Sequence, residues 1–306
     1  MKMFNKEDQK GRIGNLVKRK TLHRLEPVET YFLNKIKKLN MEQDYDVVAN
    51  ELPWFRTYSY TEFAHVFIMY PLSPIVREIQ MRDAYDDTST LDIDYVEYFK
   101  NIVLKSNANK YMGKSNLPKI EPKKHLIVPV GGNKFKETVC INKVKYIINK
   151  YGKDNVYLKP HPLTEHKLVG ELKDLLGEDV VLDRNVDLYK LMVDCKTVHS
   201  SHRSESIVYA SSLGKEIGCI DVYNKAHEGS FFHIANGIYE AGDSIEDRKK
   251  WIQRTFNSFK SGVIHPDLDP NWKTRIDNYL KYTMQVREKY KNKYVWNEKG
   301  TMEWTR

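Results

Sequence analysis

The sequence predicts an α/β protein with a doubly wound parallel sheet in the second half of its 306 residues. From His125 onward, short apolar runs alternate with amphipathic segments of helical length. This rhythm is typical of right-handed βαβ units. Polar loops rich in Gly, Ser or His follow several of the apolar runs. Because ligands of such sheets bind at the carboxyl ends of the strands, these loops are the first candidates for a functional site.

The expected elements follow from residue pattern and length. Short apolar runs bounded by glycine or polar residues predict strands, whereas apolar residues at helical spacing over a longer stretch predict helices. The predicted strands are 46–50, 65–70, 125–130, 155–160, 179–184, 196–200 and 216–222. The predicted helices are 94–104, 138–152, 165–177, 186–195 and 204–214.

A polar stretch at 105–123, interrupted by Gly113, Pro118 and Pro122, precedes the regular α/β part of the chain. Glycine and proline punctuate structure, so this stretch is the expected domain boundary. The end of the chain is again helical in pattern and rich in Trp, Tyr, Lys and Arg. The expected parts are a compact domain over 1–113, the parallel-sheet domain over 114–246 and carboxyl-terminal helices over 247–306.

Charge points to an anionic partner. The net charge is +9, and the first forty residues alone carry eleven Lys and Arg against four Asp and Glu. A basic protein of this kind suits nucleic acid, an anionic membrane surface or phosphorylated ligands. The competing interpretation is that these charges only solvate helix faces.

The three cysteines show neither CxxC nor Cys/His metal spacing, so we expect reduced core thiols and no metal site. No apolar signal segment opens the chain, and no window approaches 18 consecutive apolar residues. These observations predict a cytoplasmic protein that neither crosses a membrane nor is exported by a signal peptide.

The first candidate loop is Gly131-Gly132-Asn133-Lys134, between a predicted strand and a predicted helix. Paired glycines let backbone N–H groups approach a phosphate, and the start of the following helix adds a positive dipole end. A plain tight turn is the competing interpretation.

The second candidate loop is Lys159-Pro160-His161-Pro162, at the end of a predicted buried strand. The two prolines fix backbone φ on either side of the histidine. An imidazole held there can hydrogen-bond a phosphate or donate a proton to a leaving group near neutral pH. A rigid strand exit with an exposed histidine is the alternative.

The third candidate loop runs from His199 into a predicted helix and contains Ser200, Ser201, Ser204 and Glu205. Hydroxyl groups and free N–H groups at a helix start bind anions. Serine is also a favoured helix cap, so an ordinary cap is the alternative. The coincidence of three such loops at strand ends predicts a site for a nucleotide mono- or diphosphate. The sequence has no Walker A motif and no GxGxxG after a strand, which disfavours ATPases and NAD-dependent dehydrogenases.

At these residues the chain resembles GT-B glycosyltransferases that carry HP and SS motifs. The motifs are the strand ending in Lys159-Pro160-His161-Pro162, the short helix with "DLYKLM", and the strand ending in Ser200-Ser201. This set includes bacterial sialyl- and polysialyltransferases, capsule Kdo transferases and the CDP-glycerol polymerases of teichoic acid. The resemblance covers about residues 125–222.

The resemblance implies two Rossmann-like domains and a CMP-, CDP- or UDP-sugar donor bound without a metal or a further cofactor. It assigns donor-phosphate contact or general-acid catalysis to His161, and phosphate binding to Ser200 and Ser201. Glu205 would contact the nucleotide ribose. The amino-terminal half is short for an acceptor domain and lacks a clear acidic motif. Glu51 and Asp94 are therefore only candidates for the general base; Asp94 is equally well placed to cap a helix.

The acceptor stays open between two classes. Hydroxymethylated cytosine in DNA, as modified by tailed phages in the host cytoplasm, is favoured by cations that could contact phosphates and by a tail that interleaves cations with aromatic residues. These cations are Lys18, Arg19, Lys20, Arg287, Lys289 and Lys291. The alternative is a bacterial surface glycan, with the same segments on anionic lipid. A non-enzymatic nucleic-acid-binding protein is the third possibility.

Overall fold

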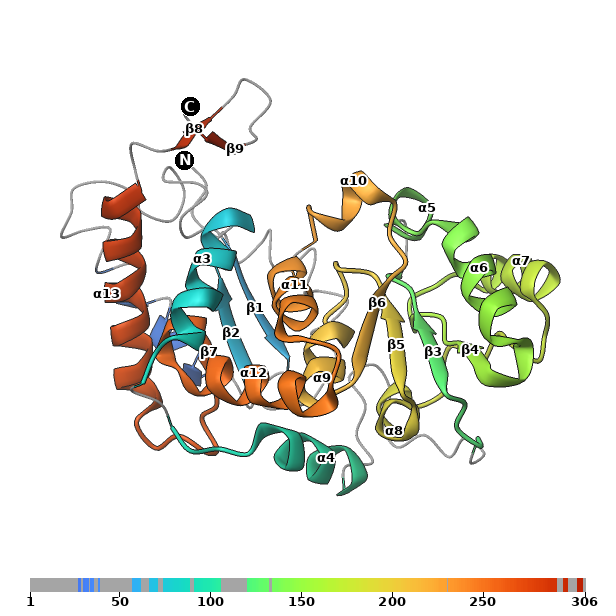
Figure 1. Cartoon of the computed structure of the whole chain (residues 1–306), viewed down its shortest axis with the longest axis horizontal. Coiled ribbons are helices and arrows are strands. Elements are labelled where there is room, and N and C mark those ends of the chain that lie inside the picture. Colours follow the sequence, from blue (N-terminus) through green and yellow to red (C-terminus); the bar gives the residue numbers. More distant parts are fainter. Residues whose placement is uncertain are drawn as a thin grey trace. The chain divides into compact units, whose positions relative to one another are not determined.

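The structure, a computed structural model, describes residues 27–28, 30–32, 34–35, 38, 57–61, 66–70, 74–88, 91–105, 120–131, 134–229, 231–290, 294–296 and 302–304 (Figure 1). The chain divides into two compact units. Unit 1 combines Met1–Asp92 with Arg254–Arg306, and unit 2 comprises Ile93–Gln253.

Unit 2 is built on the parallel sheet that the sequence predicts. Its strands stand in the order β4-β3-β5-β6 and all pair in parallel (Figure 1). The strands are β3 (His125–Val128), β4 (Val156–Leu158), β5 (Thr197–Ser200) and β6 (Glu216–Cys219). β3 and β5 are buried at every residue. After its first residue β3 is the apolar run Leu126–Val128, as expected for a strand covered on both faces, whereas β5 has only Val198 as an apolar residue. The α/β class expected from the βαβ rhythm is therefore confirmed.

The strand order creates a topological switch point between β3 and β5. From β3 the chain crosses to β4 on one side, and from β4 it returns to β5 on the other side of β3. The loops leaving β3 and β5 therefore run in opposite directions and leave a crevice at their carboxyl ends, which is where sheets of this type bind ligands. The strand expected at 179–184 is reduced to one parallel bridge, between Leu158 and Val181.

Helices connect the strands of this sheet and continue after the last one. Between the strands lie α5 (Lys134–Thr138), α6 (Ile141–Tyr151), α7 (His166–Leu176), α8 (Leu188–Asp194) and α9 (Ser206–Ser212), with the 3₁₀ turn η1 (Lys153–Asn155); α10 (Tyr223–Ala226) and α11 (Phe232–Ala241) follow β6. A core cluster of unit 2 joins β3 and β4 to the apolar faces of α6 and α7. Both helices end at glycines with positive φ, Gly152 and Gly177, a conformation that glycine adopts without steric cost.

Helix α4 (Tyr95–Lys105) belongs to unit 2, so the structure divides the chain before this helix and not in the stretch 105–123. Its buried residues Tyr95 and Phe99 stack on one another with ring centroids 5.9 Å apart, and the helix contacts α8 and α9. The sequence showed an apolar face on this helix but not which elements it covers. The second division falls inside α12 (Ile245–Asn257), after Gln253, rather than at residue 246.

Unit 1 differs from the Rossmann-like domain that the resemblance implies. Its described sheet has the order β1-β2-β7, with every pair antiparallel. The elements described in this unit are β1 (Thr57–Thr61), β2 (Val66–Tyr70), α3 (Pro74–Tyr85), η2 (Phe259–Ser261), β7 (Val263–Ile264), α13 (Trp272–Tyr290), β8 (Tyr294–Trp296) and β9 (Met302–Trp304). The strand expected at 46–50 lies outside the described residues.

Segments from both ends of the chain share the core of unit 1. Val28 and Phe32, in the helical residues near the start, pack in one cluster with Ile79 of α3 and Leu280 of α13. Arg275 of α13 is buried and donates hydrogen bonds to the carbonyls of Val263, Asn257 and Phe256 at 2.7 to 2.8 Å. This explains why residues 254–306 belong with the amino-terminal segment.

Two helical glycines of unit 2 give a matched test of the packing. A Cβ on Gly237 of α11 would lie 2.6 Å from Cε2 of Trp251, whereas a Cβ on Gly170 of α7 would meet no atom within 4 Å. We expect Gly170→Ala to raise the free energy of unfolding by about 0.5–1 kcal/mol through helix propensity. Gly237→Ala should lower it by about 1–3 kcal/mol through overpacking. Urea denaturation measures both; equal effects of the two changes would contradict the packing of α11 on Trp251.

Candidate functional site

A pocket lies at the switch point of unit 2, at the carboxyl ends of β3 and β4 and beside the loop that follows β5. We call it the strand-end pocket. Its wall combines Val128 of β3, the loop after β4, the segment that begins α8 and the residues that begin α9. The residues from these last three segments are Lys159, Pro160, His161, Pro162, Val186, Leu188, Tyr189, Ser204, Glu205 and Ser206. The second and third loops predicted from the sequence therefore meet in one pocket.

His161 lies in the wall of this pocket with its ring orientation fixed. Its Nδ1 accepts a hydrogen bond from the backbone N–H of Leu163 at 3.1 Å, and its carbonyl accepts one from Thr164 at 2.8 Å. An imidazole whose Nδ1 accepts a hydrogen bond carries its proton on Nε2. The ring is therefore held in the tautomer that can donate a hydrogen bond from Nε2.

Gly131 explains part of the first loop. A Cβ at this position would lie 2.6 Å from Cβ of His161 and would also overlap the imidazole ring. Only glycine lets the exit of β3 pass this close to the histidine. The sequence suggested that the glycine pair approaches a phosphate; the structure shows Gly131 against the imidazole instead, and Gly132 and Asn133 lie outside the described residues.

Lys159, which the sequence placed among the donor-binding residues, lines the pocket, but its side chain is almost fully buried. Its Nζ donates hydrogen bonds to the carbonyls of Pro160 at 2.8 Å and Arg184 at 2.7 Å. Burial lowers the pKa of Lys159 to about 8, against the opposing effect of Asp183 and Asp187. The ammonium group thus ties the loop after β4 to the turn that leads into α8, and both segments line the pocket.

The serines of the third loop form a chain of hydroxyl groups. Ser200 is fully buried; its Oγ donates to the carbonyl of Val128 at 3.1 Å and shares a 2.6 Å hydrogen bond with Oγ of Ser206. Oγ of Ser206 also lies 2.8 Å from Oγ of Ser204, and its single proton serves one of these two contacts at a time. Ser204 and Ser206 line the pocket, whereas Ser200 lies behind them and joins the ends of β3 and β5.

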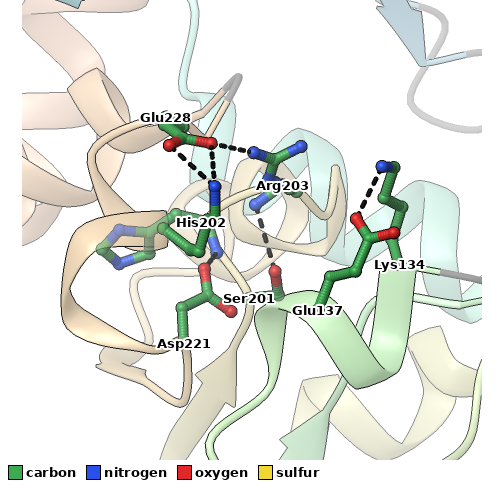
Figure 2. A network of polar contacts seen from close by, with 8 residues as sticks. Lys134, Glu137, Ser201, His202, Arg203, Asp221 and Glu228 are labelled. Atoms are coloured by element: carbon green, nitrogen blue, oxygen red, sulfur yellow. Dashed lines mark hydrogen bonds and ion pairs between the residues drawn. The ribbon is translucent and has the colours of Figure 1, made fainter.

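Ser201 points into a different network. It is fully buried, and its Oγ accepts a hydrogen bond from the backbone N–H of Arg203 at 3.3 Å. It also lies close enough to Asp221 to lower the pKa of that carboxyl group, although burial raises this pKa overall. Figure 2 shows Ser201 beside Arg203 and Asp221. The two adjacent serines that the sequence paired therefore have separate surroundings.

The opposite wall of the pocket is apolar and aromatic. Val186, Leu188 and Tyr189 come from the start of α8, where Asp187 caps the helix by accepting hydrogen bonds from Tyr189 and Lys190 N–H groups. The Tyr189 ring packs on Tyr209 with centroids 4.5 Å apart. The sequence predicted this short helix but did not identify its residues as part of a pocket. The one feature that could have done so is the pair of residues Leu188 and Tyr189 directly after the capping Asp187.

The remaining predicted residues lie elsewhere. Lys134 is exposed and pairs with Glu137 at 2.7 Å on α5 (Figure 2). Asp94 is exposed and accepts a hydrogen bond from the Glu97 N–H at 2.9 Å, so it caps α4, and it is not among the pocket residues. Lys289 is exposed on α13, above the Tyr290 ring. Glu51, Lys18, Arg19, Lys20, Lys291 and the side chain of Arg287 lie outside the described residues.

No protein-family model matches this chain, and no curated protein or solved structure matches it. None of the helices described in the structure combines the length and apolar character needed to cross a lipid bilayer. Because no known protein matches the chain, its function has to be inferred from the chemistry of the strand-end pocket. It combines an oriented imidazole, two hydroxyl groups, one carboxyl group and an aromatic wall.

The contact between Gly131 and His161 can be tested by ligand binding. Gly131→Ala should displace the imidazole and raise the Kd for CDP about tenfold or more, which corresponds to about 1.4 kcal/mol. Isothermal titration calorimetry measures this effect. Gly170→Ala, which adds the same methyl group where it meets nothing, is the control and should leave the Kd unchanged. Equal Kd values for the two variants would contradict a binding role for this contact.

Proposed function

We propose that the strand-end pocket binds the phosphate groups of a nucleotide-activated sugar and that the protein is a glycosyltransferase. The observation that carries the proposal is the meeting of His161, Ser204 and Ser206 at the switch point of a parallel sheet. In this proposal, unit 2 corresponds to the donor-binding domain of a GT-B enzyme.

The polar groups of the pocket suit a phosphate. Nε2–H of His161 is a hydrogen-bond donor, and so is the hydroxyl of Ser204 when Ser206 donates to it; phosphate oxygens are acceptors. Glu205 at the start of α9 is an acceptor and suits the hydroxyl groups of a ribose. The apolar wall with Tyr189 suits the flat face of a base or a sugar ring. Phosphate binding of this kind uses hydrogen bonds and needs no bridging cation.

The chemical role proposed for His161 follows from its tautomer. In glycosyl transfer, the bond between the anomeric carbon and the phosphate oxygen breaks, and its electron pair stays on that oxygen. A hydrogen bond from Nε2–H of His161 stabilises the negative charge on the leaving phosphate oxygen. The acceptor oxygen bonds to the anomeric carbon and loses its proton to a base. Since Asp94 caps α4, Glu51 is the base candidate that the proposal keeps.

The proposed acceptor is a hydroxymethylated base in DNA. The net charge of +9 and the basic first forty residues suit a polyanion. An enzyme that modifies a base within a duplex must also flip that base out of the stack. A bacterial surface glycan is the competing acceptor, and the second experiment below separates the two.

The donor reaction can be tested by mass spectrometry of hydroxymethylcytosine DNA incubated with a panel of CMP-, CDP- and UDP-sugars. We expect one donor to add the mass of a sugar, and His161→Ala to lower turnover by about 10²- to 10³-fold, the usual effect of removing one hydrogen-bond donor to a developing negative charge. Adding Mg²⁺ should leave the Kd of the donor nucleotide unchanged. His166→Ala, a nearby exposed histidine outside the pocket, should keep full activity. Equal activity of both histidine variants would refute the role of His161.

The acceptor can be tested by the salt dependence of DNA binding. Six to ten phosphate contacts would weaken binding on the order of 10³- to 10⁵-fold between about 50 and 200 mM salt. Replacing Lys18, Arg19 and Lys20 by alanine should flatten the slope of log K against log salt by about 0.9 per lost contact. Donor affinity should stay unchanged.

The control for this experiment replaces three exposed cations of α6 and α7, Lys145, Lys150 and Lys167, by alanine. Both variants lose three positive charges. A difference in the salt dependence of their DNA binding must therefore come from lost contacts with DNA phosphates and not from the change in net charge. A different result would identify a glycan acceptor: duplex DNA binds weakly and gains no mass with any donor, whereas an oligosaccharide gains the mass of a sugar.

A further inference from the structure

Three side chains with metal-binding atoms meet after β5 and β6, outside the strand-end pocket. They are His202, Cys219 and Asp221, whose ligand atoms all lie within 4.8 Å of one another. The register of the sheet brings them together: Ser200 of β5 pairs with Cys219 of β6, so the residues two positions further along each strand, His202 and Asp221, also lie abreast. Figure 2 shows His202 and Asp221 side by side.

The cluster contains buried polar atoms without hydrogen-bond partners. His202 is 2% exposed and Asp221 is 0% exposed. By distance and angle, both ring nitrogens of His202 and Oδ1 of Asp221 have no hydrogen-bond partner, although the carbonyl of Ala226 lies near the imidazole and the hydroxyl of Ser201 lies near the carboxyl group. Buried polar atoms of this kind are rare in folded proteins, and an ion bound between them is one of the arrangements that account for them.

The backbone around the cluster is fixed by contacts that do not use these atoms. The N–H of His202 donates to Oδ2 of Asp221 at 2.8 Å, and its carbonyl accepts from Phe231 N–H at 3.0 Å. Lys143 Nζ donates to the carbonyl of Asp221 at 2.7 Å. A Cβ on Gly229 would lie 2.6 Å from the carbonyl carbon of His202. The segment after α10 therefore covers His202 closely and holds its backbone in place.

An imidazole nitrogen, a thiolate and a carboxylate form a ligand set typical of zinc. Ligand atoms in a tetrahedral zinc site lie roughly 3.3–3.8 Å apart, given bond lengths of about 2.0–2.3 Å. The three donor atoms here lie within 4.8 Å of one another, so small side-chain rotations are enough to bring them to this spacing. Burial lowers the pKa of His202 to about 4, which keeps the ring in its neutral, metal-binding form. Burial raises the pKa of Cys219, so binding must release its proton.

We propose that His202, Cys219 and Asp221 bind one Zn²⁺ ion, with the fourth position taken by water or another small ligand. The ion would link the start of the loop after β5 to the end of β6. None of its ligands lines the strand-end pocket, so the proposal does not depend on glycosyl transfer. In this proposal the ion has a structural role. It binds the buried polar atoms of His202 and Asp221, and it holds the start of the loop after β5, whose later residues Ser204 and Ser206 line the pocket.

Cobalt provides a spectroscopic test, because a thiolate bound to Co²⁺ produces a charge-transfer band in the near ultraviolet. The full chain, dialysed against metal-free buffer, is titrated with Co²⁺ and then with Zn²⁺. We expect the band to saturate at about one equivalent, as a site with one ion requires, and Zn²⁺ to displace it. Cys219→Ser should abolish the band. Cys140→Ser removes another partly exposed thiol, outside the cluster, and should leave it intact.

A second measurement keeps the proposal testable if Cys219→Ser does not fold. In the unaltered chain, Zn²⁺ should slow alkylation of Cys219 by iodoacetamide about tenfold or more, since a metal-bound thiolate is protected. The rate at Cys140 should not change, and peptide mass spectrometry reads both sites in one sample. Absence of the cobalt band together with unprotected Cys219 overturns the proposal. A band that survives Cys219→Ser but disappears in Cys140→Ser overturns it as well.

Discussion

The strand-end pocket of unit 2 depends on the junction between the carboxyl ends of β3 and β5. The loops that follow these parallel strands run in opposite directions, and Ser200 joins the strand ends by donating a hydrogen bond to the carbonyl of Val128. The same hydroxyl contacts Ser206, and through it Ser204. A hydrogen bond made within a buried region is stronger than one in water, and an unpaired hydroxyl there is costly. The position of the pocket serines is therefore set by the sheet itself.

Around this junction, some of the polar groups that the sequence predicted to contact a ligand instead hold the loops of the strand-end pocket in place. The ammonium group of Lys159 binds two backbone carbonyls, and Ser200 lies behind the pocket wall. Lys159 and Ser200 belong to motifs that the sequence predicted to bind a ligand, yet the polar atoms of both side chains form hydrogen bonds with backbone carbonyls of the protein. Such a division is physically sensible, since a phosphate site needs donors held in place, and donors on loops are held by buried hydrogen bonds.

The sequence was sufficient for the parallel sheet and for two of the loops that meet in the strand-end pocket. The apolar part of β3 identified a buried strand, and the parallel pairing then places the residues after β4 and β5 at one edge of the sheet. It was insufficient where tertiary packing decides. The apolar face of α4 does not reveal its partners α8 and α9, and the GG pair does not reveal that Gly131 packs on His161. The described strands of unit 1 pair antiparallel, but in the sequence they show no clear alternation of apolar and polar residues. The sequence therefore did not distinguish this sheet from the parallel sheet of a Rossmann-like domain.

The cluster of His202, Cys219 and Asp221 illustrates the same limit, because its ligands share no local spacing and meet only through the register of β5 and β6. The loop after β5 thus has two anchors of different chemistry. Near its start, the backbone N–H of His202 binds Asp221; further along, the serine hydroxyls bind one another and the end of β3. Between these anchors lies Arg203, paired with Glu228 at 2.6 Å and partly exposed. A loop fixed at both ends loses little conformational entropy when a ligand binds, so its hydrogen-bond donors can favour a phosphate without first being ordered.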